Sequence, residues 1–420
     1  MHILLLTQLF QPEPNFLKGI SFAKRLVNEG HTVEVLTGFP NYPEGEVYPG
    51  YKQRLFFKEV IDGIPIKRVP LFPDHSQSGI KRFFSYISFA LSSSLIGPFL
   101  IKRPDLIHIY LGPSTLVIPA LFLKFLFKSP IIQDIQDIWP ESVTGSGMLR
   151  WRIGEKAIHW FCKIGYRFSN GFIVLSNGYK QLLIQRGVQD DKIFVVYNWA
   201  QENESVNNSE SSCNVFDCVS SNESLFKDFN LQSGKTYVVY AGNHGILQNL
   251  KTVIDAAKIV ANKCPNVEFL FFGDGVEKED LVRHSIEKKI NNVRFYPRVS
   301  QQQLVQIYSL ASLLLVHLKD SPLCRVGIPQ KTQAYLSMGK PLLVAVNGVT
   351  AELIEEAEAG IIAKAEDPVS IAEGILRFLK LTPEDQKQLG ENGYRLYQQK
   401  MSFNVGMNIV LKIFDEFAEK

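Results

Sequence analysis

The chain has 420 residues, of which 45% are hydrophobic and 21% are charged, and its formal net charge is +3 at pH 7. This length exceeds that of one ordinary domain, so two domains are expected, each able to bury a full core. The nearly balanced charge argues against a nucleic-acid-binding protein, in which Lys and Arg are concentrated on one face.

The cysteines and the first residues indicate where the protein is found. Five scattered cysteines form no CxxC pair, which favours reduced thiols over a disulfide framework. The apolar residues 1–10 have no basic segment before them and lead directly into Gln11-Pro12-Glu13-Pro14, so we expect a first buried strand and not a signal peptide. These features predict a cytoplasmic protein.

The first 200 residues show the alternation that is typical of a parallel α/β sheet. Residues 3–7 form a continuous apolar run, residues 20–27 carry apolar side chains at helical spacing, and residues 32–37 form another apolar run. Gly30 stands where a glycine commonly ends a helix. A strand, a helix and a second strand in this order predict a right-handed crossover and a parallel sheet. Further strands are expected at 105–109, 131–132, 172–175 and 193–196.

Two apolar stretches in this half are considered as membrane segments. Residues 83–101 are interrupted by serines, Gly97 and Pro98 and are flanked by cations on both sides, and residues 116–127 are too short to cross a bilayer. We favour buried helices of the first domain. The alternative is a helix that lies in the membrane surface, and a true span is the least favoured interpretation.

Residues 201–224 are rich in Ser, Asn and Glu, which predicts a linker or a surface excursion. A second strand–helix series follows, so two α/β units are expected to face each other across a cleft. Its strands are expected at 237–240, 267–272, 292–296, 313–316 and 341–346, with helices at 250–261 and 402–417. We place a first domain at 1–200, a linker at 201–232, a second domain at 233–395 and a C-terminal helix at 396–420, a candidate for crossing back to the first domain.

Two glycine turns in the second half are candidate phosphate sites. Gly242 follows a strand and a helix begins shortly after it, and such a turn presents free backbone N–H groups to an anion. Gly273-Asp274-Gly275 ends the next strand, where glycines allow a ligand to approach the backbone closely. Each turn is equally consistent with packing alone, because Asp-Gly is a common turn pair.

A third segment, Gly327-Ile328-Pro329-Gln330-Lys331-Thr332, points to an anion more directly. The proline predicts a helix that begins beside it, with Lys331 and Thr332 in the first turn. A lysine is unfavourable at this end of a helix, where the dipole prefers acidic side chains. We infer that the positive charge serves an external anion such as a diphosphate, and the alternative is a solvated surface lysine.

The segments IPQKT and YLSMGKPLL resemble the signature of bacterial family 4 glycosyltransferases of the GT-B fold. The segments YAGNHG, FFGDG, TGFPNYPEG and QDIQDIWPES resemble the same family, in particular O-antigen and capsule enzymes that transfer N-acetyl-L-fucosamine. The resemblance covers nearly the whole chain except residues 201–224. It implies an α/β architecture of two Rossmann-like domains that face each other across a deep cleft.

The resemblance also implies a donor site in the second half. Lys331 and Thr332 would hold the diphosphate at a helix N-terminus, and Asn15 would lie in the loop that closes over the phosphates. In the first half, Gln136 and Asp137 fall where such enzymes place polar residues that face the transferred sugar. The implied donor contacts are Asn15, Gly242, Asn243, Gly273, Asp274, Gly275, Arg298, Val299, Arg325, Ile328, Pro329, Lys331, Thr332 and Gln333, and the implied catalytic residues are Gln136, Asp137 and Lys331.

The sequence departs from the family pattern at several of these contacts. Val326 and Ala334 stand where many members have a pair of glutamates, the second of which binds the ribose. The usual Arg and Lys after the first glycine turn are Asn243 and Gln248, and the glycine pair of the N-terminal loop is Glu13-Pro14. Gln333, Arg325 and Arg298 are the candidates to compensate.

Other polar and aromatic residues have structural interpretations that we prefer. Asp134, Asp137 and Glu141 could hold a metal ion, but their spacing is loose and no His or Cys joins them, so a helix start is favoured and no metal is expected. His108 is expected in the core. Trp139, Trp151 and Trp160 are expected in packing or on an acceptor surface.

The function that the resemblance implies is transfer of a sugar from a UDP-sugar to a lipid-linked saccharide in O-antigen or capsule biosynthesis. The sugar would be N-acetyl-L-fucosamine or a related amino-deoxy sugar, transferred with retention, without a cofactor or metal. The enzyme would be peripheral on the inner face of the cytoplasmic membrane and would bind no nucleic acid. Two alternatives are a sugar-nucleotide epimerase of the same architecture and a non-catalytic membrane-associated scaffold.

Overall fold

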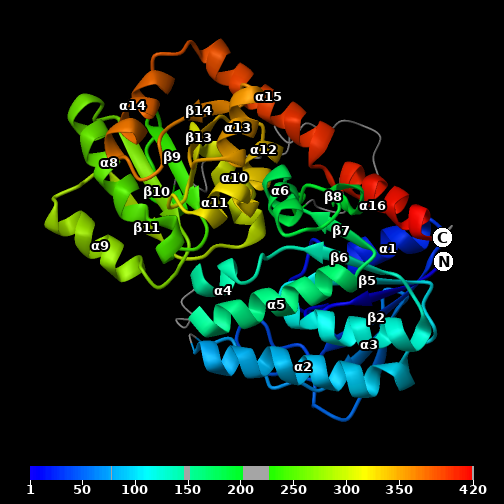
Figure 1. Ribbon diagram of the computed structural model, residues 1–420. Helices are drawn as coiled ribbons and strands as arrows, with labels where there is room; N and C mark the ends of the chain where they lie inside the picture. The colour runs from blue at the N-terminus through cyan, green and yellow to red at the C-terminus, as the bar shows by residue number, and fades with distance from the viewer. Residues whose placement is uncertain (77, 146–151, 202–226, 419–420) are drawn as a thin grey trace. The chain divides into compact units, whose positions relative to one another are not determined.

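A computed structural model describes residues 1–76, 78–145, 152–201 and 227–418 (Figure 1). The chain forms two compact units: unit 1 comprises Met1–Tyr197 with Gly406–Lys420, and unit 2 comprises Asn198–Val405. Each unit is built on its own sheet of mainly parallel strands covered by helices, which confirms the predicted α/β class with two Rossmann-like domains. The predicted linker falls largely on residues 202–226, outside the described residues.

The sheet of unit 1 has eight strands in the order β3-β4-β2-β1-β5-β6-β7-β8. All neighbouring strands are parallel except β3 and β4, which form an antiparallel hairpin at the edge. The order reverses between β1 and β5, where the carboxyl ends of the strands form the usual ligand crevice of such sheets. The strands are β1 (His2–Leu6), β2 (Thr32–Gly38), β3 (Phe57–Ile61), β4 (Ile64–Val69), β5 (Leu106–Leu111), β6 (Ile131–Ile135), β7 (Gly171–Val174) and β8 (Ile193–Val195).

The β3–β4 hairpin was not among the predicted elements. Its turn is Asp62-Gly63, and both residues have positive φ, 49° and 80°. This dipeptide is typical of a two-residue hairpin turn, so the local signal was present in the sequence. The strand β3 escaped prediction because it lies at the edge of the sheet and is half exposed, and therefore lacks a continuous apolar run.

Six helices within the described residues of the N-terminal part cover unit 1, and the C-terminal helix α16 (Phe403–Ala418) joins them over most of its length. Phe414 packs against His108 with ring centroids 5.4 Å apart, and Phe417 packs against Phe194. Arg25 Nη2 donates to Asn408 Oδ1 at 3.0 Å. The last helix is thus part of the core of unit 1. The other helices are α1 (Ile20–Asn28), α2 (Gly79–Leu100), α3 (Val117–Phe127), α4 (Glu141–Gly145), α5 (Arg152–Phe168) and α6 (Asn177–Gln185).

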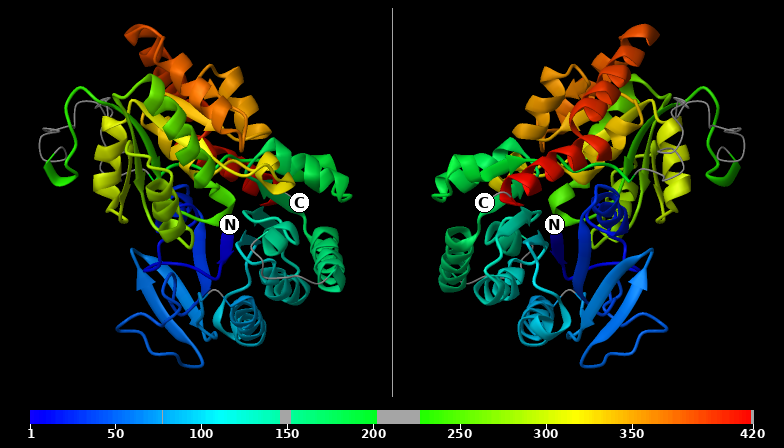
Figure 2. Two further views of the ribbon diagram at one scale, coloured as in Figure 1. Left: turned by 90° about the vertical axis from the view of Figure 1, so that its left-hand side faces the viewer. Right: turned by 90° about the vertical axis from the view of Figure 1, so that its right-hand side faces the viewer.

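The two apolar stretches form helices as predicted, but α2 is not a buried helix. Within the described residues α2 alone is long and apolar enough to cross a membrane, by length and composition only, and about a third of its apolar window (33%) is buried. Figures 1 and 2 show α2, α3 and α5 side by side on one flank of unit 1. The interpretation as a core helix therefore fails for one face of α2.

The sheet of unit 2 has six parallel strands in the order β11-β10-β9-β12-β13-β14. Counted from β9, this is the 3-2-1-4-5-6 order of a dinucleotide-binding fold, in which ligands bind where the strand order reverses, here between β9 and β12. The strands are β9 (Thr236–Ala241), β10 (Val267–Phe272), β11 (Val293–Tyr296), β12 (Leu313–His317), β13 (Leu342–Ala345) and β14 (Gly360–Ile362).

The helices of unit 2 bury the sheet on both faces. The side chains of α8, α9 and α14 form one apolar core with the strands beneath them, which is why the strands are apolar throughout. The helices are α8 (Leu250–Lys263), α9 (Lys278–Glu287), α10 (Gln301–Leu310), α11 (Pro322–Val326), α12 (Gln330–Ser337), α13 (Val349–Glu356), α14 (Pro368–Phe378) and α15 (Pro383–Lys400).

Candidate active site

The two glycine turns of unit 2 lie side by side at the carboxyl ends of β9 and β10. Gly242 N donates to Phe272 O at 2.9 Å, and His244 N donates to Asp274 O at 2.8 Å. Gly273 has φ of +136°, and a Cβ atom on it would lie 2.0 Å from Gly242 O. Contact between the two backbones therefore requires glycine at position 273, whether or not a ligand is present. Gly242 itself remains exposed at the surface of this pair of turns.

The ammonium group of Lys331 lies beneath the Gly242 turn. As predicted, Lys331 is in the first turn of α12, which begins just after Pro329. Its Nζ is buried 3.4 Å from the centroid of the Tyr240 ring and 3.3 Å from where a Cβ of Gly242 would be. Within the part of the chain that the structure describes, this Nζ has no hydrogen-bond partner.

Burial changes the pKa of the Lys331 ammonium. Removal from water lowers the pKa of its ammonium well below the ordinary value. A buried cation is costly unless an opposite charge or an aromatic face offsets the loss of hydration, and among the described residues the Tyr240 ring alone does so. The ammonium of Lys331 thus has no carboxylate counter-charge within the described part of the chain.

The first turn of α12 brings together only some of the predicted contacts. Thr332 lies next to Lys331, and its buried Oγ1 also has no partner among the described residues. The Gln333 side chain instead turns back toward its own helix, with its amide 2.9 Å from Pro329 O and 3.0 Å from Gln330 O. Ile328 is buried before the helix begins. In this conformation Gln333 does not extend toward a ribose.

The other predicted donor contacts at these turns differ in their exposure to solvent and in the hydrogen bonds that they already make. Asn243 is exposed, and its carbonyl oxygen accepts a hydrogen bond from Tyr240 Oη at 2.7 Å. Asp274 accepts from Gly275 N at 2.9 Å, and this bond together with Lys278 lowers the pKa of its carboxyl.

Arg298, Val299 and Arg325 lie on loops or short helices that follow strands. Arg298 is exposed and Val299 is half-buried, just beyond β11. Arg325 is exposed and forms a bidentate pair with Asp320, at 2.6 Å from Nε and 2.7 Å from Nη2. Its guanidinium is thus already neutralised by a neighbouring carboxylate, so it is a weaker candidate than Lys331 for a phosphate.

Two histidines at this edge of the sheet were not singled out from the sequence. The His244 ring is buried among Tyr240, Phe271 and Phe295, and desolvation, followed by the charges of Lys278 and Lys331, lowers its pKa to about 4. The ring is therefore neutral at pH 7.

His317 ends β12 at the switch point of the sheet. Its Nδ1 lies 2.7 Å from Gln248 O, and its Nε2 accepts from Glu366 N at 3.3 Å. Glu366 in turn accepts from Asn249 Nδ2 at 2.9 Å and from Asp320 N at 2.9 Å. The position of His317 directly after an apolar run was a usable signal, whereas nothing in the sequence identified Glu366.

Unit 1 has a buried charge cluster at the carboxyl end of its own central strands. Lys18 Nζ lies 3.1 Å from Asp134 Oδ2, and His108 Nε2 lies 3.4 Å from the same oxygen. All three residues are nearly inaccessible to solvent. Burial would raise the pKa of Asp134, but Lys18 and then His108 hold it below its ordinary value. His108 is thus a core histidine, as predicted.

The two predicted sugar-facing residues follow directly after β6. Gln136 Nε2 donates to Asp134 Oδ1 at 2.5 Å, so the charge cluster fixes its amide. Asp137 is exposed, and the protein atoms around its carboxyl raise its pKa to about 6 by desolvation. Glu141 pairs with Arg186 at 2.5 Å, so it and Asp134 have different cationic partners.

The N-terminal loop is held by its own polar side chains. Asn15 Nδ2 donates to Leu9 O at 3.1 Å, and its Oδ1 accepts from Lys18 N at 3.1 Å. Glu13 is buried and accepts from the backbone N–H groups of Asn41 and Tyr42, each at 2.8 Å. Asn15 therefore shapes the loop that carries Lys18. Of the tryptophans, Trp139 is packed in the core, Trp160 is exposed, and Trp151 lies outside the described residues.

Comparisons with known proteins agree with this arrangement. The family Glycosyl transferases group 1 matches residues 221–396, and the Glycosyl transferase 4-like domain matches residues 21–199. WcaI of Escherichia coli (strain K12), whose name places it in colanic acid biosynthesis, is 24% identical over 77% of this chain and 78% of its own. WbjE of Pseudomonas aeruginosa, named as a glycosyltransferase, is 22% identical over 72% of each chain.

A solved structure supports the fold. The structure of Anabaena Alr3699/HepE in complex with UDP and glucose has a TM-score of 0.66 and 16% sequence identity, and it covers 98% of this chain and 99% of that chain. The two matched domains together account for both units. The chain belongs to the family 4 glycosyltransferases of the GT-B fold.

Proposed function

We propose that the protein transfers a sugar, with retention of configuration, from a UDP-sugar to a lipid-linked saccharide in O-antigen or capsule biosynthesis. The sugar is N-acetyl-L-fucosamine or a related amino-deoxy sugar. The observation that carries the proposal is the buried ammonium of Lys331, without a partner among the described residues, beneath the exposed Gly242 turn. The name of the Escherichia coli relative supports polysaccharide biosynthesis, and the Anabaena protein, which was solved in complex with UDP and glucose, supports a UDP-linked donor.

The chemistry needs stabilisation of a leaving group. As the bond to the anomeric carbon breaks, positive charge develops on the sugar and negative charge on the departing diphosphate. Lys331 Nζ and the N-terminus of α12 supply positive charge at one place without a metal ion. Low solvent exposure strengthens this interaction, because the field of the ammonium is less screened than in water.

In unit 1, Gln136 and Asp137 are the residues that we assign to the transferred sugar. Gln136 is fixed by Asp134, and Asp137 is exposed directly after β6. Asp137 orients the acceptor or stabilises the cationic sugar, and the leaving diphosphate takes the acceptor proton. We place the protein at the inner face of the cytoplasmic membrane, where a lipid-linked saccharide is found.

A donor screen tests this proposal. The full-length protein is incubated with UDP-, GDP- and TDP-sugars, with and without a membrane extract as the source of acceptor, and the released nucleotide is measured. We expect release of UDP that depends on the extract. An epimerised sugar nucleotide formed without acceptor would establish the epimerase instead, and the absence of UDP binding by calorimetry would contradict both.

A further inference from the structure

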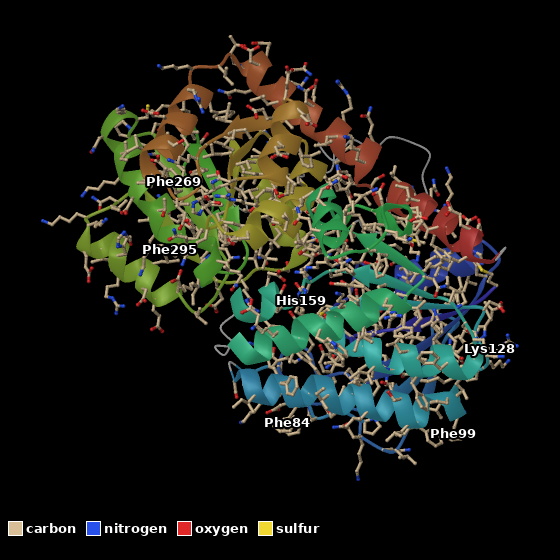
Figure 3. All side chains as sticks on the ribbon, in the orientation of Figure 1. Phe84, Phe99, Lys128, His159, Phe269 and Phe295 are labelled. Carbon is tan, nitrogen blue, oxygen red and sulfur yellow. The ribbon has the colours of Figure 1, made fainter. Side chains whose placement is uncertain are left out.

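The helix α2 exposes large apolar side chains of the kind that a surface helix usually buries. Large apolar residues recur along its outer side at the spacing of one helical face, and each is between 52% and 86% exposed. We call these residues the outer stripe: Ile80, Phe84, Leu91, Leu95 and Phe99. Figure 3 shows Phe84 and Phe99 pointing away from the body of unit 1.

The inner side of α2, which packs on the sheet, is made largely of small and hydroxylated residues. Ser93 Oγ donates to Phe89 O at 2.5 Å, and Ser94 Oγ donates to Ala90 O at 2.6 Å, so these buried hydroxyls are satisfied within the helix. A Cβ on Gly97 would lie 2.8 Å from Leu36 Cδ2 of β2, so the helix lies very close to the sheet.

This arrangement excludes two ordinary explanations for the outer stripe. A helix of a globular protein usually turns its large apolar side chains to the core, whereas α2 exposes those of the outer stripe and buries mainly small and hydroxylated residues together with Phe89 and Leu100. A membrane span would require α2 to leave the sheet. The close contact between Gly97 and β2 would then be lost, and the serine side of the helix would face lipid. A helix whose outer side meets lipid while its inner side stays on the protein satisfies both observations.

The neighbouring helices extend the apolar surface. The helix α3 exposes Phe122, Phe125 and Leu126, and α5 exposes Trp160, which is 67% exposed. Figures 1 and 2 show that α3 lies beside α2 and that α5 lies beside α3. Aromatic side chains are well suited to the boundary between headgroups and acyl chains. The exposed apolar area is therefore a feature of three helices and not of a few isolated residues.

The charges around this surface identify the kind of lipid. Residues 79–104 and 116–130 contain no Asp or Glu, but they contain Lys81, Arg82, Lys102, Arg103, Lys124 and Lys128. The first four cations lie at the two ends of α2, a helix about 33 Å long. Cations at both ends of an apolar stripe suit a helix that lies flat among anionic headgroups.

We propose that the outer stripe of α2, with the exposed apolar side chains of α3 and α5, docks unit 1 onto a bilayer that contains anionic lipids. This inference rests on the proposed function in one respect: docking would bring the enzyme to the bilayer that contains the proposed lipid-linked acceptor. The docking itself depends on α2 and its flanking cations, and on no residue that we assign to sugar transfer.

Flotation with vesicles tests the docking directly. The full-length protein is mixed with vesicles of phosphatidylcholine alone, or of phosphatidylcholine with about a third phosphatidylglycerol, and the vesicle-bound fraction is measured. A triple variant of the outer stripe, Leu91→Gln, Leu95→Gln and Phe99→Gln, is expected to bind anionic vesicles at least about tenfold more weakly. The matched control changes three exposed apolar residues of unit 2, Val276→Gln, Ile286→Gln and Val369→Gln, and is expected to bind like the wild type.

A charge variant tests the choice of lipid. Lys102→Gln with Arg103→Gln is expected to lower binding to anionic vesicles by about fivefold for each cation, whereas Lys263→Gln with Lys387→Gln is expected to have no effect. Equal loss in both triple variants, or binding that does not depend on phosphatidylglycerol, would overturn the proposal. So would a wild type that ignores vesicles but forms a dimer that the outer-stripe variant abolishes, because the occupant would then be a second copy.

Calorimetry with UDP separates this proposal from the proposed function. Outer-stripe variants are expected to keep the wild-type affinity for UDP, because they change unit 1 whereas the Gly242 turn and Lys331 belong to unit 2. Vesicle binding without UDP binding would contradict the proposed sugar transfer from a UDP-sugar but support the docking surface. UDP binding without vesicle binding would contradict the docking surface but leave the proposed sugar transfer standing.

Discussion

Replacement of Lys331 by methionine is expected to lower activity and raise stability at the same time. The methionine side chain fills nearly the same volume but cannot carry charge. If the ammonium stabilises the departing diphosphate, its loss removes about 3 kcal/mol of transition-state stabilisation, or at least a hundredfold in kcat/KM. Uridine nucleotide should also bind more weakly, because the same charge meets the ground-state phosphates.

The stability effect follows from the surroundings of Lys331. Removing an ion from water costs several kcal/mol in a protein, and one aromatic face returns about 2 kcal/mol of this. In the unliganded protein at pH 7 the Lys331→Met variant should therefore be more stable than the wild type by about 1 kcal/mol or more. The free energy of unfolding, measured with urea, checks this value.

The gain in unfolding free energy on addition of UDP tests the effects of Lys331→Met on stability and on UDP binding in one assay. At a UDP concentration of a hundred times Kd, the wild type should gain about 2.7 kcal/mol, whereas the variant should gain much less at the same concentration. The matched control is Lys340→Met, because Lys340 is half-buried and, like Lys331, has a pKa lowered by desolvation, but it lies just before the amino end of β13.

Two results would contradict the role assigned to Lys331. Full activity and an unchanged UDP affinity in Lys331→Met would remove this residue from the phosphate site. A variant that is less stable than the wild type by more than about 1 kcal/mol would show that the ammonium has a favourable partner in the folded, unliganded protein.

Three further changes have consequences that the structure makes specific. Gly273→Ala places a Cβ atom 2.0 Å from Gly242 O at positive φ, and urea unfolding should show a loss of about 3 kcal/mol or more. Asp134→Asn leaves the Lys18 ammonium buried without its counter-charge and should cost about 3–5 kcal/mol; the double variant with Lys18→Met should recover much of this, and equal instability of single and double variants would contradict the pairing. The folded-state pKa of His244, about 4, lies below its ordinary value, so the folded protein binds this proton more weakly than the unfolded chain. Stability should therefore fall as pH drops from 6.5 through 4, by about 2 kcal/mol more in the wild type than in His244→Gln, and parallel pH profiles would argue against a buried neutral ring.

The sequence predicted the strands of the sheets best, because strands covered on both faces are apolar throughout. The run 267–272 coincides with β10, and the run 313–316 lies within β12. The hairpin strand β3 was missed since half of its side chains face solvent. The face of α2 that meets solvent was wrongly assigned to the core, because hydrophobicity alone does not say on which side of a helix the protein lies.

For the candidate site, the sequence predicted positions better than partners. Pro329 indicated where α12 begins, and this was enough to place Lys331 in its first turn. That the Tyr240 ring lies against the ammonium depends on the packing of α12 over β9, two elements far apart in the chain. The ion pair between Lys18 and Asp134 likewise joins a loop to a strand far away in the chain, and no local sequence pattern predicts it.

Because the last helix belongs to unit 1, the core of this unit is completed only at the end of translation. Its core includes Val410, Ile413 and Phe414, which leave the ribosome only after all of unit 2 has been made. Until then the ring of His108 lacks the aromatic neighbour that α16 provides. Unit 2 is continuous in the chain and can fold during translation, whereas the first unit to be synthesised is the last to be completed. A nascent chain arrested before α16 would therefore carry an open apolar groove, a natural place for a chaperone to bind.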